Sequence, residues 1–169
     1  MKMNKKRLAL TIIVGILALA INVFIIVQAS LDSVRSSESS GMLVSFLKTV
    51  INAIVPNTIN DSNIDVFSSV IRKLVGHFGL FLINGLLTSW FIYLLKSFFL
   101  KFKYWIDIII SLSFGLFVAA LTEFIQIYTP GRSGEFLDIL IDYSGYILGT
   151  GIIVLVIYLI LKREKKRAL

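Results

Sequence analysis

The sequence predicts an all-α membrane protein of four transmembrane helices, with one or two amphipathic helices on the outer face of the membrane. Two observations lead to this fold class. The chain is 57% hydrophobic and only 16% charged, well below the roughly 25% charge of an ordinary soluble domain. Four apolar runs also reach the length of about 20 residues that a helix needs to cross the hydrocarbon core. Because no second composition regime is present, residues 1–169 are expected to form a single domain.

The four apolar runs define the expected spans. The first run follows the basic segment "MKMNKKR" and so has the position of a signal peptide. It is too long for one and has no clean small-residue cleavage pattern, so we expect it to be retained. It carries no charged residue, whereas the later three runs contain ionisable groups. The spans are expected at residues 8–29, 74–95, 105–128 and 137–161.

An outer segment, residues 42–73, lies between the first two spans. The serine-rich stretch before it, "SLDSVRSSESSG", is expected to be a turn region. Apolar residues then recur at spacings of three and four, which predicts a helix with one apolar face that ends at Pro56. After the loop "PNTINDSN", a second amphipathic piece leads into the second span. Helices of this kind lie in the membrane interface. The apolar positions are Leu43, Phe46, Leu47, Val50, Ile51 and Ile54, then Ile64, Phe67, Val70, Ile71 and Leu74.

The orientation follows from the distribution of lysine and arginine. With the N-terminus inside, twelve of the 17 basic residues lie on the inner side and five on the outer side. Loops rich in lysine and arginine tend to stay on the cytoplasmic side. Both termini are therefore expected to be cytoplasmic. The net charge of +7 does not indicate nucleic-acid binding, because the basic residues cluster beside apolar runs and not along a soluble face.

Polar side chains converge near the expected outer ends of three spans. Glu123 lies about 7 Å inside the end of the third span, and Gln126 follows it at i+3. Asp138 and Asp142 share a face of the fourth span at i and i+4. A carboxylate within a span costs roughly 2.5–3.5 kcal/mol on insertion scales and tends to mark function. The candidate binding residues are His77, Glu123, Gln126, Arg132, Asp138 and Asp142.

Arg132 is expected to bridge Glu123 and one of the aspartates in a bidentate fork. A purely structural interpretation stays open, because buried ion pairs can also fix the register of a loop and a helix. Asp107 is expected to form a solvated pair with Lys101 or Lys103 at the inner interface. The small-xxx-small pair of Gly145 and Gly149 indicates close helix packing. Asn84 and Thr88 are expected to share the helix face of His77.

Several chemistries lack their residues. The chain has no cysteine and a single histidine, so no metal centre and no cofactor is expected. It also has no Walker-type loop, no GxSxG and no HExxH, which removes the signatures of nucleotide hydrolysis, a nucleophile elbow and zinc proteolysis. His77, Glu123 and Asp142 remain the candidates for general acid and base work.

The stretches "HFGLFLINGLL" and "EFIQIYTPGRSGEFLDILIDYSGYILG" resemble the VanZ-like family of bacterial membrane proteins. The family pattern is His-Phe, Glu-x-x-Gln, a Pro-Gly-Arg turn, aspartates at the start of the last helix, and Gly-x-x-x-Gly. The match covers roughly residues 70–152. Tyr143 and Ser144 stand before the helix glycine, where many members carry an asparagine.

The resemblance implies a location in the bacterial cytoplasmic membrane. The family is named for an accessory protein of glycopeptide resistance that lowers susceptibility to teicoplanin, a lipoglycopeptide that binds cell-wall precursors. One expected function is therefore to bind or screen an anionic envelope lipid, a lipid-linked cell-wall precursor or a lipoglycopeptide, with an oligomer allowed. The alternative is a membrane enzyme that modifies an envelope lipid or glycan with glutamate or aspartate and histidine.

Overall fold

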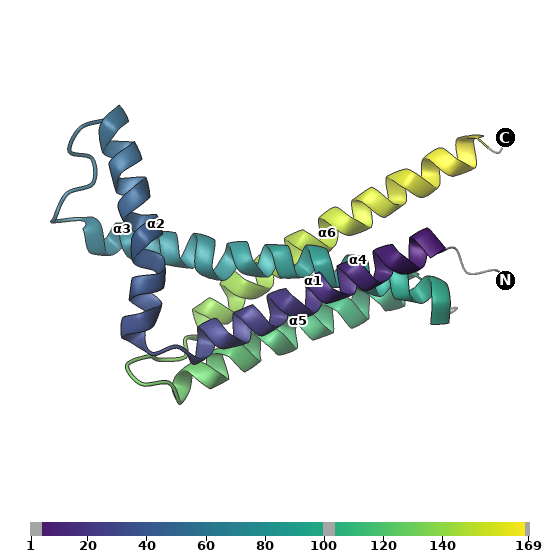
Figure 1. The fold of residues 1–169 in the computed structure, drawn as a ribbon, viewed down its shortest axis with the longest axis horizontal. Helices are drawn as coiled ribbons and strands as arrows, with labels where there is room; N and C mark the ends of the chain where they lie inside the picture. Colours follow the sequence, from purple (N-terminus) through teal and green to yellow (C-terminus); the bar gives the residue numbers. More distant parts are fainter. Residues whose placement is uncertain (1–4, 100–103, 168–169) are drawn as a thin grey trace.

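The computed structural model describes residues 5–99 and 104–167, and these residues contain no β-strand. Nearly all of them are helical, which confirms the predicted fold class (Figure 1). One element, η1, is a π-helix, whose turns are wider than those of an α-helix. The elements are α1 (Lys5–Ser30), α2 (Ser33–Ile54), α3 (Ile64–Ile71), η1 (Arg72–Gly79), α4 (Leu80–Phe99), α5 (Tyr104–Ile127) and α6 (Phe136–Arg167).

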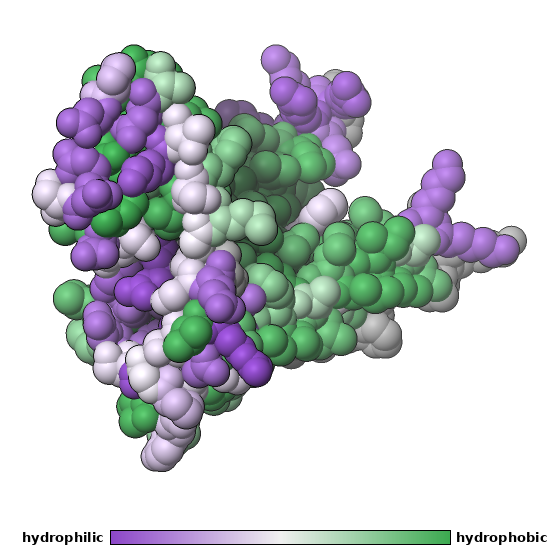
Figure 2. Space-filling view, turned by 60° about the vertical axis from the view of Figure 1, so that its left-hand side comes forward, coloured by the Kyte–Doolittle hydropathy of each residue, from purple (hydrophilic) through white to green (hydrophobic). Residues whose placement is uncertain are grey.

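Four of the described helices are long and apolar enough to cross a membrane, which supports a multi-pass membrane protein. The predicted spans all fall within these helices to within one residue. The second span is longer than predicted because α3, η1 and α4 form one continuous helix. In the space-filling view, an apolar belt covers the bundle between polar surface at either end (Figure 2). The candidate spans are Lys5–Ser30, Ile64–Lys96, Trp105–Ile127 and Phe136–Arg167.

The helix α4 is central, because it packs against α1, α5 and α6. Both termini of the chain lie at one end of the bundle, which we call the terminal end (Figure 1). The opposite end, the loop end, carries α2, α3, η1 and residues 128–135, which join α5 to α6. The core between the helices contains Ile25, Phe81, Val118, Ala119 and Tyr146, one or two from each of the four spans.

Two glycines allow α6 to pack closely against η1 and α4. A Cβ atom added at Gly145 would collide with the backbone carbonyl of Phe78, and one added at Gly149 would collide with that of Leu82. These contacts are with backbone atoms, so no side-chain rearrangement could relieve them. The predicted role of the glycine pair in helix packing is therefore confirmed, and the close approach brings α6 against the helix that carries His77.

The serine-rich stretch is not a turn region, as the sequence suggested, because α2 already begins at Ser33. Asp32 caps this helix: its side chain accepts a hydrogen bond of 2.9 Å from the backbone N–H of Arg35. The serines then bond back into the helix, as Ser40 does with the carbonyl of Ser36 at 3.1 Å. A strong N-cap and these local bonds outweigh the low helix propensity of serine.

The loop between α2 and α3 forms where the sequence predicts it. The side chain of Asn52 holds it by donating to the carbonyl of Ile59 at 2.7 Å and accepting from its N–H at 2.8 Å. Apolar side chains of α2 such as Met42, Phe46 and Ile54 are exposed. An exposed apolar face on a helix at the end of a membrane bundle is typical of an interfacial helix.

Candidate functional site

The six candidate residues all lie at the loop end, on four neighbouring pieces of the chain. His77 is on η1, Glu123 and Gln126 are in the last turns of α5, and Arg132 is in the loop that follows. Asp138 and Asp142 are in the first turns of α6. Glu123, Asp138 and Asp142 are buried, with 3%, 8% and 1% of their surface exposed. We call these six residues, together with Lys73, the loop-end cluster.

Glu123 ties the end of α5 to the start of α6. One of its carboxylate oxygens accepts a hydrogen bond of 2.7 Å from Gln126, and the other accepts one of 2.9 Å from the backbone N–H of Glu135. The chain reverses direction between them at Gly131, whose φ of 71° lies in the left-handed region that glycine adopts readily. The Glu-x-x-Gln motif and the Pro-Gly-Arg turn thus work together to shape this connection.

His77 connects η1 to both aspartates of α6. Its Nδ1 lies 3.1 Å from an oxygen of Asp142, and its Nε2 lies 3.7 Å from Asp138. A π-helical turn places its side chains differently from an α-helical one and often occurs at functional sites. In this chain it lies where His77 meets α6.

Lys73 belongs to the cluster although the sequence analysis did not select it. Its ammonium group lies 2.7 Å from Asp138 and 3.2 Å from Glu135. Because Lys73 precedes His77 by four residues on one helix, the spacing could have indicated a shared face. Its partners are Glu135, just before α6, and Asp138 on α6, which are 62 and 65 residues away in sequence.

Arg132 does not form the predicted fork with carboxylates. No carboxylate of the described residues lies within 4.0 Å of its guanidinium; instead, this group donates to the carbonyl of Gln28 at 3.1 Å and to the hydroxyl of Ser36 at 3.5 Å. The carboxylate of Asp138 pairs with Lys73 of η1 and not with Arg132. Burial lowers the pKa of Arg132 from its ordinary value, and the nearby charge of Glu123 opposes that shift. The guanidinium of Arg132 therefore donates its hydrogen bonds to α1 and α2 and lies beside the buried carboxylates without pairing with them.

The loop-end cluster borders a cavity of about 220 Å³, the loop-end cavity. Its polar lining includes Arg72, His77, Gln126, Arg132 and Asp142. Its remaining walls come mainly from α1, α2, η1 and α4, with one residue each from α3 and α5, and are largely apolar. Sequence patterns did not point to the contributions of α1 and α2, because these residues look like ordinary parts of a span and of an interfacial helix. They are Phe24, Ile25, Gln28 and Ala29 of α1, and Ser36, Ser40 and Leu43 of α2.

Asn84 does not join His77, although the two were expected to share a helix face. It exchanges side-chain hydrogen bonds of 3.0 Å and 3.1 Å with Asn22 of α1. Thr88 donates to Asn84 at 2.8 Å and extends that separate network. The two expected partners of Asp107, Lys101 and Lys103, lie outside the described residues. Among the described residues, Asp107 accepts a bond of 2.6 Å from Lys96.

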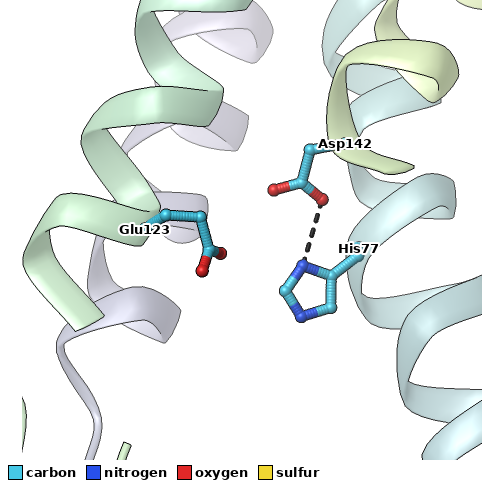
Figure 3. A group of neighbouring side chains, drawn as sticks. All are labelled: His77, Glu123 and Asp142. Atoms are coloured by element: carbon cyan, nitrogen blue, oxygen red, sulfur yellow. Dashed lines mark hydrogen bonds and ion pairs between the residues drawn. The ribbon is translucent and has the colours of Figure 1, made fainter. Parts of the chain in front are cut away.

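His77, Glu123 and Asp142 also present a possible ligand set. One nitrogen or oxygen atom from each lies within 4.8 Å of the others. Glu123 projects from α5 towards the pair that His77 and Asp142 form on the opposite side (Figure 3). The arrangement can exchange a proton between histidine and carboxylate, bind a cation, or receive a polar group from the loop-end cavity.

A family comparison agrees with the motifs of the site. The sequence model of the VanZ/LLP1 family matches residues 12–159, which include all six candidate residues. The chain matches no curated protein and no solved structure. The family match nevertheless runs from the first span to the last and covers most of the chain. This protein therefore belongs to the VanZ/LLP1 family.

Proposed function

We propose that this protein binds the phosphate group of a lipid-tailed envelope molecule in the loop-end cavity, and that it contributes to glycopeptide resistance by screening that molecule. The ligand class includes anionic membrane lipids and lipid-linked cell-wall precursors. The observation that carries the proposal is the composition of the cavity, which combines Arg72 and Arg132 with apolar walls at one end of a membrane bundle.

The two arginines supply the anion-binding chemistry. A guanidinium is a planar fork of donors that matches the oxygens of a phosphate. Arg132 is already held in place by Gln28 and Ser36, so little side-chain entropy is lost when an anion binds. Asp142 also lines the cavity and would oppose an anion, but His77 lies 3.1 Å from it and offsets its charge when protonated.

The size of the cavity limits what it holds. Its volume of about 220 Å³ is below the roughly 300–1,000 Å³ of a pocket that encloses a drug-sized ligand. It therefore fits a phosphate and the first part of the attached chain. The rest of a lipid tail would continue along exposed apolar side chains such as Phe24, whose surface is 46% exposed.

The loop end is proposed to face the outside of the bacterial cytoplasmic membrane, with both termini in the cytoplasm. The twelve-to-five distribution of basic residues supports this orientation. In intact cells, an impermeant thiol reagent should label the Ser133→Cys variant at the loop end but not Lys165→Cys at the terminal end. The reverse labelling pattern would place the cavity in the wrong compartment for an envelope ligand.

Lipid binding can be measured by native mass spectrometry of the purified protein in detergent. Phosphatidylglycerol and a polyprenyl-diphosphate-linked cell-wall precursor should bind, each in preference to neutral diacylglycerol. Arg132→Gln should reduce retention of both ligands at least tenfold, whereas Arg35→Gln should not. Arg35 is the matched control because it is exposed on α2, where it pairs with Asp32.

Comparing phosphatidylglycerol with the cell-wall precursor shows which class of molecule supplies the bound phosphate. Growth assays then connect binding to resistance. Cells that express the wild type should show a higher inhibitory concentration of teicoplanin than cells with Arg132→Gln at equal membrane abundance. Equal retention of all three lipids by the wild type and Arg132→Gln would overturn the proposal. A mass change in the bound ligand would favour the enzyme alternative.

A further inference from the structure

We propose that His77, Glu123 and Asp142 bind one divalent metal cation of the zinc class. The three side chains come from η1, α5 and α6 and face a common space (Figure 3). One donor atom from each lies within 4.8 Å of the other two. Both carboxylates are almost fully buried, which is unusual for a pair of acidic groups without a cation. The proposal concerns these three residues alone and does not depend on lipid binding.

The spacing of the donor atoms is close to that of a metal site. Zinc binds nitrogen and oxygen at about 2.0–2.2 Å, so neighbouring ligand atoms in a tetrahedral site are about 3.4 Å apart. The Nδ1 atom of His77 and the oxygen of Asp142 are 3.1 Å apart. The separations involving Glu123 are at most 4.8 Å, so its carboxylate would need to move inward by no more than about 1.4 Å, a distance that a side-chain rotation covers.

The contacts around His77 provide a second, independent observation. Metal-binding histidines usually donate their other N–H to a carboxylate, and metal-binding carboxylates are themselves hydrogen-bonded. Nε2 of His77 faces Asp138 at 3.7 Å, and Lys73 holds Asp138 at 2.7 Å. This chain of contacts can orient the imidazole so that Nδ1 points to the metal.

Glu123 has support of the same kind. Each of its oxygens accepts one hydrogen bond, from Gln126 at 2.7 Å and from the backbone of Glu135 at 2.9 Å. Every carboxylate oxygen can accept more than one contact, so a lone pair on each remains for a cation. Asp142 accepts from His77 through one oxygen, and the second oxygen of its carboxylate can also serve as a ligand atom.

The donor set selects the kind of metal. Magnesium and calcium prefer all-oxygen sites with several carboxylates, carbonyls or waters, whereas an imidazole favours zinc and related transition metals. Three protein ligands also leave a coordination position open, as in catalytic zinc sites. His77 and Asp142 line the loop-end cavity, so a molecule in that cavity would reach the open position.

The competing explanation is that a proton, and no metal, joins His77 to Asp142. Metal content distinguishes the two. Protein purified in detergent through an affinity tag without histidine, stripped with EDTA and dialysed, should bind one Zn²⁺ per chain in a calorimetric titration. Its melting temperature should rise with ZnCl₂ because the metal binds only the folded state. MgCl₂ and CaCl₂ should bind at least tenfold more weakly.

The variants His77→Gln, Glu123→Gln and Asp142→Asn should each lower Zn²⁺ affinity at least tenfold. Glu164→Gln is the matched control, because Glu164 is exposed in the last turns of α6, at the opposite end of that helix from Asp142. If a variant does not fold, the zinc X-ray absorption spectrum of the wild type still tests the site, since it should show a single imidazole among oxygen ligands. Failure of the folded wild type to take up Zn²⁺, unchanged affinity in all three variants, or a spectrum without an imidazole would overturn the proposal.

Discussion

Two buried polar clusters that differ in charge lie between α5, α6 and the continuous helix that η1 and α4 form. The loop-end cluster contains three buried carboxylates, a histidine and a lysine. Nearer the terminal end, the hydroxyl cluster consists of Ser89, Ser111, Tyr146 and Thr150. Ser89 bonds to Ser111 at 2.7 Å and to Thr150 at 2.9 Å, and Ser111 bonds to Tyr146 at 3.1 Å. The hydroxyl cluster joins α5 and α6 to α4, whereas the loop-end cluster joins them to η1, which continues into α4. The hydroxyl cluster does so with neutral groups alone.

The difference shows that this bundle does not need charges to hold α4, α5 and α6 together. Neutral hydrogen bonds between membrane helices contribute about 0.6 kcal/mol each on average, while a charged residue within a span costs roughly 2.5–3.5 kcal/mol to insert. A cluster that served only to hold the helices together could therefore consist of neutral groups, as the hydroxyl cluster does. The proposed ligand and the proposed cation would each account for the charges at the loop end.

Cavities alone do not distinguish the two regions. Ser89, Ser111 and Thr150 border a second cavity of about 240 Å³ near the terminal end. Most of its other lining residues are apolar, and its one carboxylate, Asp107, is paired with Lys96 at 2.6 Å. No arginine of the described residues lines it. The chemistry of the lining thus separates the clusters more clearly than the volume does.

The largest loss of stability is expected at the close contact between α6 and α4, which lies between the two clusters along α6. Gly149 lies on α6 between Asp142 and Thr150, and its α-carbon packs against the backbone of α4. We expect Gly149→Leu to separate the helices and to destabilise the protein by about 3 kcal/mol or more. Thermal unfolding in detergent would measure this loss, and lipid and Zn²⁺ binding should fall with it.

Gly151→Leu is the control for that substitution. It lies two residues further along α6, where an added Cβ atom meets nothing within 4 Å. It should leave stability and both binding reactions unchanged. Equal destabilisation by the two substitutions would show that a bulky side chain is costly anywhere along this part of α6, and that the close packing at Gly149 does not set the cost.

A smaller effect is expected when one charge of the loop-end cluster loses its partner. Lys73→Met leaves Asp138, which is 8% exposed, without its closest cation. Because 32% of the Lys73 side chain is exposed, we expect a cost of about 1–2 kcal/mol, below that of a fully buried pair. The double variant Lys73→Met with Asp138→Asn should recover part of the loss, which a double-mutant cycle of thermal unfolding would measure.

Lys48→Met provides the comparison for this cycle. Lys48 lies 3.8 Å from Asp61, whose side chain is fully exposed, and the pair is at the surface of the α2–α3 segment. Its removal should change stability by less than the removal of Lys73. A cycle with no coupling between Lys73 and Asp138 would mean that solvent already screens the charges, and the contrast with the hydroxyl cluster would weaken.

The spans and the converging carboxylates could be predicted from the sequence because each rests on a local pattern. An apolar run of sufficient length must be helical in a membrane, since no other structure satisfies its backbone there. The family motifs also carry local geometry, as the bond between Glu123 and the start of α6 shows. These features need no knowledge of how distant helices pack.

The partners within the site depended on packing that no local pattern specifies. Arg132 and Lys73 are both cations that could pair with the carboxylates. Only the register of η1 against α6 determines that Lys73 pairs with Asp138. The helical start of α2 was missed because the capping by Asp32 competes with the turn preference of serine. The walls from α1 and α2 could not be predicted, because the cavity exists only once these helices meet α4.

The smallest expected effect is in the hydroxyl cluster and tests whether the two clusters act independently. Thr150→Val keeps the shape of a side chain that is 3% exposed but removes its hydroxyl bond to Ser89. We expect a loss of stability of about 0.6 kcal/mol, and below roughly 1.7 kcal/mol, as for other hydrogen bonds between membrane helices. Ser144→Ala, on the exposed side of α6, removes a hydroxyl bond within one helix and serves as the control. Lipid retention and Zn²⁺ affinity should be the same in both variants as in the wild type, because the hydroxyl cluster does not line the loop-end cavity. If Thr150→Val instead abolished either binding reaction while the protein remained folded, the two clusters would act as one unit. The distinction between a structural hydroxyl cluster and a binding loop-end cluster would then fail.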